Sequence, residues 1–255
     1  MKSNPEFKNM MPETREENPE AKIHDAIEEL RGPIEKLLGE LREKIDGGEY
    51  QLIIGDDASG RIPTLIFDNL LKRVYKEKGY EPPQTLFFAG AQLFKEEEKK
   101  VRTSAVSGFL KKGILGKELD GRALIVTDTI SSGDALESIT VGLKEAGIQF
   151  DIVTIALIDL ENDKFPEGRL QLKLGGKIYY GNRSINTPGI YGSRGISGVY
   201  KESSKDLFAR PIVKQKDMEG DRFLTSEGIQ KQIGRAREDV KVLSEDLLRW
   251  YRTQS

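Results

Sequence analysis

The residues with the clearest chemical potential lie in one stretch between Ala123 and Leu136. Asp128 follows an apolar run, and two hydroxyls and a glycine come shortly after it at Ser131–Gly133. A carboxylate accepts hydrogen bonds from hydroxyl groups or binds a hard cation. Hydroxyls and unhindered backbone N–H groups at the start of a helix bind an anion such as phosphate. The stretch therefore predicts a phosphate site with an acceptor for hydroxyls or a cation beside it.

The flanking residues predict a buried strand before this site and a helix after it. Ala123–Val126 is apolar, contains β-branched residues and is preceded by Gly121, which is typical of a central parallel strand. From Ala135 to Gly147 apolar residues recur at helical spacing. The local order is therefore strand, small-residue loop and helix. The alternative interpretation is an ordinary turn whose serine or aspartate caps the helix.

A second strand, loop and helix come earlier in the chain. Tyr50–Ile54 is typical of a strand, residues 55–61 form a loop bounded by glycines, and a helical stretch follows from Ile62 to about Lys78. Both loops leave strand carboxyl ends, where ligands bind in parallel sheets, so they can converge on one site. The alternative for Asp56 and for Asp57 is capping of the turn.

Further apolar runs predict the fold class. Thr85–Ala89 and Asp151–Ile158 are typical of strands, and Lys177–Tyr180 predicts another. Strands and helices joined by right-handed crossovers predict an α/β fold with a doubly wound, mostly parallel sheet. The basic segment 92–117 is expected to be a lid or a solvated face. The glycine-rich segment 181–201 is expected to be a base-stacking hood or a connector.

Two apolar helical stripes flank this core. One covers Ile23–Ile45 and is broken near Gly32 and Pro33, and the other covers Ile229–Trp250 at heptad spacing. We expect them to pack on each other or on a second protomer of a homodimer. The expected divisions are a disordered polar tail at 1–20, a helical segment at 21–48, the α/β core at 49–180, the hood or connector at 181–222 and a helix at 223–255.

Composition bounds the functional classes. The chain has 255 residues, of which 37% are hydrophobic, enough for one α/β domain with appendages. Its 40 basic and 42 acidic residues nearly cancel, so we expect no general attraction to nucleic acid or to a membrane surface. The absence of cysteine excludes disulfides and thiolate metal sites. No apolar run is long enough for a membrane span or a signal peptide, and a cytoplasmic protein is expected.

The stretch around Asp128 resembles the phosphoribosyl-pyrophosphate (PRPP) loop of type I phosphoribosyltransferases. That loop has four apolar residues, two acids, two apolar residues and a turn of the form Ser/Thr-Ser/Thr-Gly-x-Ser/Thr. The matching positions are the four apolar residues, Asp128, Ile130, Ser131, Ser132 and Gly133, and the differing ones are Thr127 for the first acid, Thr129 for an apolar residue and Ala135 for a hydroxyl.

The resemblance implies a phosphoribosyltransferase-like fold, PRPP or a nucleoside monophosphate as ligand, and Mg²⁺ as cofactor. In the family the acids hold the ribose hydroxyls, the turn holds the 5′-phosphate, and a loop at the position of 55–61 holds pyrophosphate. Asp56 or Asp57 could reach that pyrophosphate through Mg²⁺. The implied residues are Asp128 for catalysis; Asp128, Thr129, Ser131, Ser132, Gly133, Asp134 and Ala135 for PRPP; Asp57, Ala58, Ser59, Gly60 and Arg61 for pyrophosphate; and Asp57 and Asp128 for the metal.

The reaction that the resemblance implies is attack of a nitrogen acceptor on the anomeric carbon of PRPP. Mg²⁺-pyrophosphate leaves through an oxocarbenium-like state that positioning and electrostatics stabilise. Because Thr127 replaces one acid, a non-catalytic nucleotide- or PRPP-sensing module on the same fold is the alternative. A third hypothesis is a protein that interacts through its helices on a relic of this fold.

Overall fold

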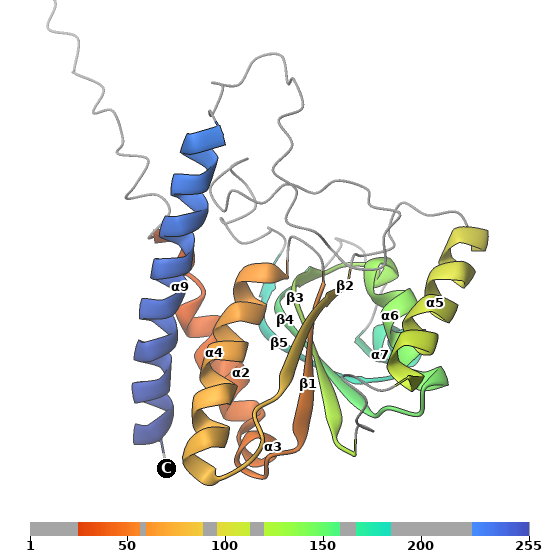
Figure 1. Cartoon of the computed structure of the whole chain (residues 1–255), viewed down its shortest axis with the longest axis horizontal. Coiled ribbons are helices and arrows are strands. Elements are labelled where there is room, and N and C mark those ends of the chain that lie inside the picture. Colours follow the sequence, from red (N-terminus) through yellow and green to blue (C-terminus); the bar gives the residue numbers. More distant parts are fainter. Residues whose placement is uncertain are drawn as a thin grey trace, which may run out of the picture.

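The computed structural model describes residues 25–56, 60–88, 96–112, 120–158, 167–184 and 226–254. The strands are β1 (Tyr50–Asp56), β2 (Gln84–Phe88), β3 (Arg122–Ile130), β4 (Phe150–Ile158) and β5 (Lys177–Ser184). They form one sheet in the order β2-β1-β3-β4-β5, and every neighbouring pair is parallel (Figure 1). The predicted α/β class with a doubly wound sheet is confirmed. The connections change direction between β1 and β3, which is therefore the topological switch point.

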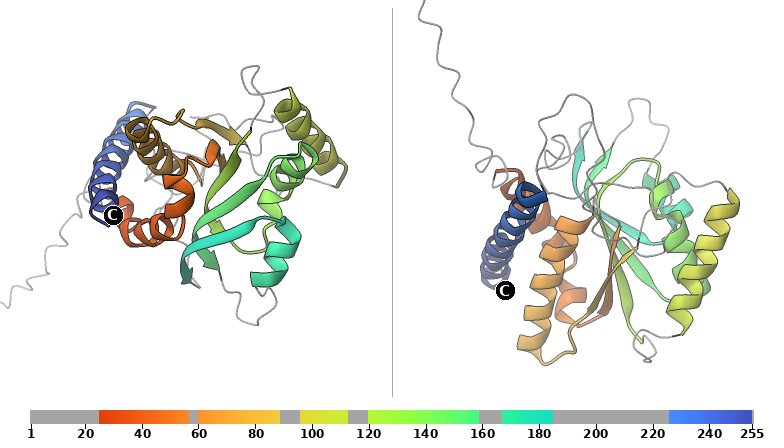
Figure 2. Two further views of the ribbon diagram at one scale, coloured as in Figure 1. Left: turned by 90° about the horizontal axis from the view of Figure 1, so that it is seen from below. Right: turned by 45° about the horizontal axis from the view of Figure 1, so that its top comes forward.

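Helices cover both faces of this sheet (Figures 1 and 2). One face carries α2 (Arg31–Glu40), α3 (Arg42–Asp46), α4 (Arg61–Lys78) and α9 (Ser226–Thr253). The other carries α5 (Glu96–Lys111), α6 (Asp134–Glu145) and α7 (Glu167–Leu174). The described residues thus form three layers, with the sheet between two groups of helices.

Alternation along the strands divides the core between the two faces. In β3, Leu124 and Val126 pack toward α2, α4 and α9, whereas Ala123 and Ile125 pack toward α5, α6 and α7. All four side chains are completely buried. The buried central strand predicted from the sequence is confirmed, and it continues beyond Val126 to Ile130. Asp128, predicted to follow the strand, therefore lies within its last three residues.

The C-terminal helix α9 lies along α4 and α2 (Figures 1 and 2). Tyr251 donates a hydrogen bond to Asp46 Oδ1 at 2.8 Å, and the Arg31 guanidinium donates to Asp246 Oδ2 at 2.9 Å. The two apolar stripes are predicted from the sequence to pack on each other or on a second protomer. The structure shows the first arrangement, in which α9 contacts α2, and α9 also contacts α4. The buried apolar residues of α9 are Ala236, Val240, Leu243, Leu247, Leu248 and Tyr251.

One fully buried acid ties the amino ends of the strands together. Asp151 accepts hydrogen bonds from Lys44 Nζ at 2.7 Å and from the Tyr50 hydroxyl at 2.9 Å. The Arg122 guanidinium adds two more at 3.1 Å each. Burial raises the pKa of Asp151, but the hydrogen bonds from its three partners outweigh this and leave the pKa below its ordinary value. The carboxylate therefore stays ionised and links α3, β1, β3 and β4.

Helices α5 and α7 are not predicted from the sequence. The segment expected to be a basic lid or a solvated face contains α5, whose Val106 and Leu110 are buried against the sheet layer. Three other predictions fall on residues outside the described ones, namely the tail at 1–20, the pyrophosphate-loop residues Asp57, Ala58 and Ser59, and the glycine-rich segment beyond Ser184.

Candidate functional site

A cavity of about 100 Å³ lies at the carboxyl ends of β1 and β3. It is lined by Asp56 and by Asp128–Leu136, which includes every residue predicted to bind PRPP. This is the switch point of the sheet, where open α/β folds bind their ligands. Its volume suits a single phosphate group, since sites for drug-sized ligands measure roughly 300–1,000 Å³.

Two buried carboxylates from neighbouring strands meet at one hydroxyl in this site. Thr127 Oγ1 lies 3.2 Å from Asp56 Oδ2 and 3.2 Å from Asp128 Oδ1. Thr127 is completely buried, and each acid is 5% exposed. The register pairs Gly55 with Val126, so the next residues along the two strands are neighbours. A hydroxyl has one proton and donates it to one carboxylate at a time.

Asp56 therefore places a second carboxylate beside Asp128. Thr127 itself carries no carboxylate, and the second carboxylate at this point comes from the neighbouring strand β1. Sequence reasoning assigns Asp56 only to the other loop, as a turn cap or an indirect metal ligand. The register of β1 against β3, which brings Asp56 to Thr127, has no local signature in the sequence.

The donor set at these acids fits Mg²⁺. Two carboxylates and a hydroxyl offer hard oxygen ligands, which this ion prefers. The described residues contain no group of three or more acidic, histidine or cysteine side chains suited to a metal. Mg²⁺ commonly takes only one or two protein carboxylates and completes its shell with water and substrate phosphate. Asp56 and Asp128 therefore fit an ion held jointly with a phosphorylated ligand.

The turn after β3 is shaped by Gly133 and by α7. Gly133 has φ of 77°, in the left-handed region that glycine adopts without strain. A Cβ at this position would lie 3.3 Å from side-chain atoms of Leu170 and of Leu174. The glycine is therefore required by the turn and its packing on α7. The sequence analysis instead predicts a glycine here because it leaves the backbone N–H groups accessible to a phosphate.

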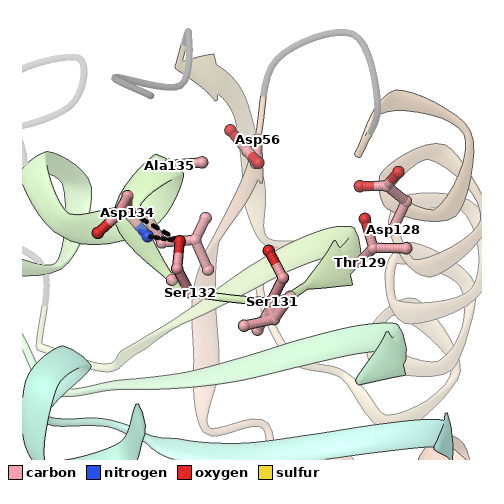
Figure 3. Close-up of a pocket in the computed structure, with 10 residues that line it drawn as sticks. Asp56, Asp128, Thr129, Ser131, Ser132, Asp134 and Ala135 are labelled. Atoms are coloured by element: carbon pink, nitrogen blue, oxygen red, sulfur yellow. Dashed lines mark hydrogen bonds between the residues drawn. The ribbon is translucent and has the colours of Figure 1, made fainter. Parts of the chain in front are cut away.

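Ser132, Asp134 and Lys173 form a polar cluster at the start of α6. Ser132 Oγ donates to Asp134 Oδ2 at 2.7 Å, as Figure 3 shows. Lys173 Nζ donates to the Ser132 carbonyl oxygen at 3.0 Å and pairs with the Asp134 carboxylate. Hydrogen bonds from Lys173 and from Ser132 hold the pKa of Asp134 below its ordinary value. Sequence reasoning misses Lys173 because it misses α7, although Leu170 and Leu174 have helical spacing.

Two predicted pyrophosphate residues lie at the start of α4. The Gly60 N–H donates to the Asp56 carbonyl oxygen at 2.8 Å, so the predicted N–H donor already has an acceptor within the chain. A Cβ at Gly60 would lie 2.7 Å from the Val126 carbonyl oxygen, so only glycine allows this close approach. Arg61 is the first residue of α4.

An aromatic ring positions Arg61. The guanidinium lies 4.6 Å from the centre of the Phe87 ring, in β2. The same ring packs on Gly55, where a Cβ would be 2.5 Å from Phe87 Cδ1 and 2.8 Å from Thr64 Oγ1. The bare backbone of Gly55 therefore makes room for the ring, and the ring supports the cation through a cation–π contact.

Comparisons with known proteins give a likeness among solved structures alone. No protein-family model matches the chain, and no curated protein matches it. Among solved structures, the crystal structure of purine phosphoribosyltransferase from Pyrococcus horikoshii Ot3 resembles it with 18% sequence identity and a TM-score of 0.33, over 66% of this chain and 85% of that chain. No described helix has the length and apolarity needed to cross a membrane. The functional argument therefore rests on the geometry of the site.

Proposed function

We propose that this chain binds PRPP or a nucleoside 5′-monophosphate and transfers the phosphoribosyl group of PRPP to a nitrogen acceptor, releasing pyrophosphate. One observation carries the proposal: Asp56 and Asp128 share the Thr127 hydroxyl beside a cavity that is also lined by the turn at Ser131–Ala135. Figure 3 shows the two acids and the turn around this cavity. Acceptors for hydroxyls or a cation thus stand next to a helix start that favours phosphate. A ribose 5-phosphate has this combination of groups.

Each part of the site has a role in this proposal. The turn and the start of α6 hold the 5′-phosphate, since the positive end of the helix favours an anion. The Asp134 N–H donates to Ser132 Oγ at 3.4 Å and the Leu136 N–H to the Gly133 carbonyl oxygen at 3.1 Å, so the phosphate would replace or share these acceptors. Asp128 accepts hydrogen bonds from the ribose hydroxyls. Arg61 faces the pyrophosphate and balances its charge. Held at these three points, the anomeric carbon is oriented toward the attacking nitrogen, which is the main contribution that a protein makes to this kind of transfer.

Asp56 and Asp128 are the residues that would hold Mg²⁺. When bound, the ion supplies neutralisation of the negative charge on pyrophosphate. Asp56 joins Asp128 in this proposal because it lines the cavity, whereas Asp57 lies outside the described residues. The two acids also raise the local negative charge, so PRPP binding is expected to require the cation.

A non-catalytic PRPP- or nucleotide-sensing module is the second candidate. Thr127 favours it, because this hydroxyl replaces a carboxylate that members of the resembled family use on the ribose. A sensor needs the phosphate turn and one acid for binding, but it needs no orientation of an acceptor. The two candidates therefore predict the same ligand and differ in whether pyrophosphate is released.

The test combines calorimetry with an assay of pyrophosphate release. Wild-type protein is titrated with PRPP, with and without Mg²⁺, and with ribose 5-phosphate and inorganic phosphate. Asp128→Asn is expected to weaken ribose 5-phosphate binding about 10- to 100-fold, from a charge-assisted bond of roughly 1.5–3 kcal/mol. Binding of inorganic phosphate should stay nearly unchanged, because only the turn contacts it. Asp120→Asn removes an exposed carboxylate just before β3 and serves as the matched control.

Release of pyrophosphate is then measured with a panel of nucleobases and amines. Release with any acceptor supports the transferase. Binding of PRPP without release from any of them would support the sensing module. No binding of PRPP, nucleoside monophosphate or ribose 5-phosphate would refute both. Parallel loss of phosphate and ribose 5-phosphate binding in Asp128→Asn would mean that Asp128 supports the loop instead of the ribose.

A further inference from the structure

The short helix α7 is anchored against the phosphate turn. Leu170 and Leu174 are 2% and 0% exposed and belong to the core on that face of the sheet. Both approach Gly133 closely, as the position of a Cβ there shows. Lys173 is next to one of these anchors and reaches the turn with its ammonium group. The packing of α7 thus fixes a cation beside the start of α6.

Asp134 is an unfavourable residue for a phosphate site. It lies in the first turn of α6, where the helix end attracts anions and where the proposed function places a phosphate. An ionised carboxylate at this point repels a phosphate and competes for the same helix end. The hydrogen bonds from Lys173 and Ser132 lower the pKa of Asp134, so its carboxyl group is ionised at pH 7.

Both oxygens of this carboxylate are occupied by the turn and by α7. Ser132 Oγ donates to Oδ2 at 2.7 Å, and Lys173 donates to Oδ1. Lys173 also holds the Ser132 carbonyl oxygen at 3.0 Å, so one ammonium group fixes the turn and the acid together. Figure 3 shows Asp134 and Ser132 linked at one end of the group of labelled residues, with Asp128 at the other end. The negative charge of Asp134 is thereby balanced and directed toward α7.

We infer that Lys173 is a positioning residue for phosphate binding, because it neutralises Asp134 and turns this carboxylate away from the start of α6. The inference rests on the proposed function, which puts the phosphate at this turn. It assigns to Lys173 an effect that passes through Asp134 and needs no contact between the lysine and the ligand. The ligand class is a phosphate monoester such as ribose 5-phosphate.

A double-mutant cycle separates this role from direct contact. Binding of ribose 5-phosphate is measured by calorimetry for wild type, Lys173→Met, Asp134→Asn and the double variant. Lys173→Met is expected to weaken binding about tenfold, or ~1.4 kcal/mol, because it leaves Asp134 unbalanced beside the phosphate. Adding Asp134→Asn to Lys173→Met is expected to restore binding to within about threefold of wild type. Lys173→Arg keeps the charge and should bind as wild type does.

Lys144→Met is the matched control, since it removes a lysine from the last turn of the same helix, α6. Thermal unfolding of each variant shows whether the fold is retained. If Lys173→Met does not fold, the test is the comparison of Asp134→Asn with wild type. Weaker binding of ribose 5-phosphate by Asp134→Asn would then overturn the positioning role of Lys173. Unchanged binding in Lys173→Met, or a loss that Asp134→Asn does not restore, would also overturn it. Absence of any binding by wild type would instead refute the proposed function.

Discussion

Replacing Thr127 by valine tests the link between the two acids. Valine has nearly the shape of threonine, so the change removes a hydroxyl from a completely buried position and leaves its packing. That hydroxyl makes one charge-assisted hydrogen bond at a time, to Asp56 or to Asp128, at 3.2 Å in either case. Bonds of this kind contribute roughly 1.5–3 kcal/mol. The two buried carboxylates also lose the proton that separates them.

The expected loss is large enough to measure by calorimetric thermal unfolding. For a chain of this size, 1 kcal/mol shifts Tm by roughly 2–4 °C, so Thr127→Val should lower Tm by roughly 3–12 °C without Mg²⁺. Excess Mg²⁺ should reduce this deficit, because the cation attracts both carboxylates and offsets their repulsion in place of the hydroxyl proton. The difference between the two conditions reports on the metal without any catalytic assay.

Thr140→Val is the matched control for this experiment. Thr140 is also completely buried, but its hydroxyl donates to a neutral acceptor, the Glu137 carbonyl oxygen, at 3.1 Å. This change should cost roughly 0.5–1.5 kcal/mol with and without Mg²⁺. If Thr127→Val lowers Tm no more than the control does, the charge-assisted bond is refuted. If its deficit is the same in both conditions, the cation does not bind between the acids.

Three further outcomes are expected. Asp151→Asn should lower the free energy of unfolding in urea by about 2–4 kcal/mol at pH 7, since it removes the fully buried charge that compensates two partly buried cations, Lys44 and Arg122. Because the folded pKa of Asp151 is depressed, the wild-type advantage is complete above the ordinary value of 3.8 and disappears as pH falls below it. Gly55→Ala should displace Phe87 and with it Arg61, so calorimetry should show weaker binding of pyrophosphate and little change for ribose 5-phosphate. Leu247→Ala, at a site with 0% exposure, should cost about 2–5 kcal/mol in the same urea assay, and a value near zero would mean that α9 is dispensable.

The elements predicted correctly are those with a strong local pattern. The apolar run before Asp128 and the heptad spacing in α9 each indicate their element without knowledge of the neighbours. Helix α7 has only eight residues, and α5 starts in the charged run Glu96–Lys100, so neither shows a long apolar stripe. Such helices form because the sheet offers them a surface, which is a tertiary effect and leaves little trace in the sequence.

The candidate site divides in the same way. The turn at Ser131–Ala135 is contiguous in sequence, so its residue types alone indicate a phosphate site. The pairing of Asp56 with Asp128 depends on the register of β1 against β3, and Lys173 reaches the turn from a helix that is itself unpredicted. Groups that meet only through strand register or helix docking cannot be found from residue spacing along the chain.

The position of α9 has a consequence for the order in which the molecule folds. Its partner α4 is complete at residue 78, whereas α9 begins at residue 226. During synthesis the apolar side of α4 is therefore exposed until the whole sheet and both of its strand edges have been made. Contacts between such distant segments also raise the contact order, which slows folding. We therefore expect the nascent chain to be prone to aggregation until α9 has docked on α4.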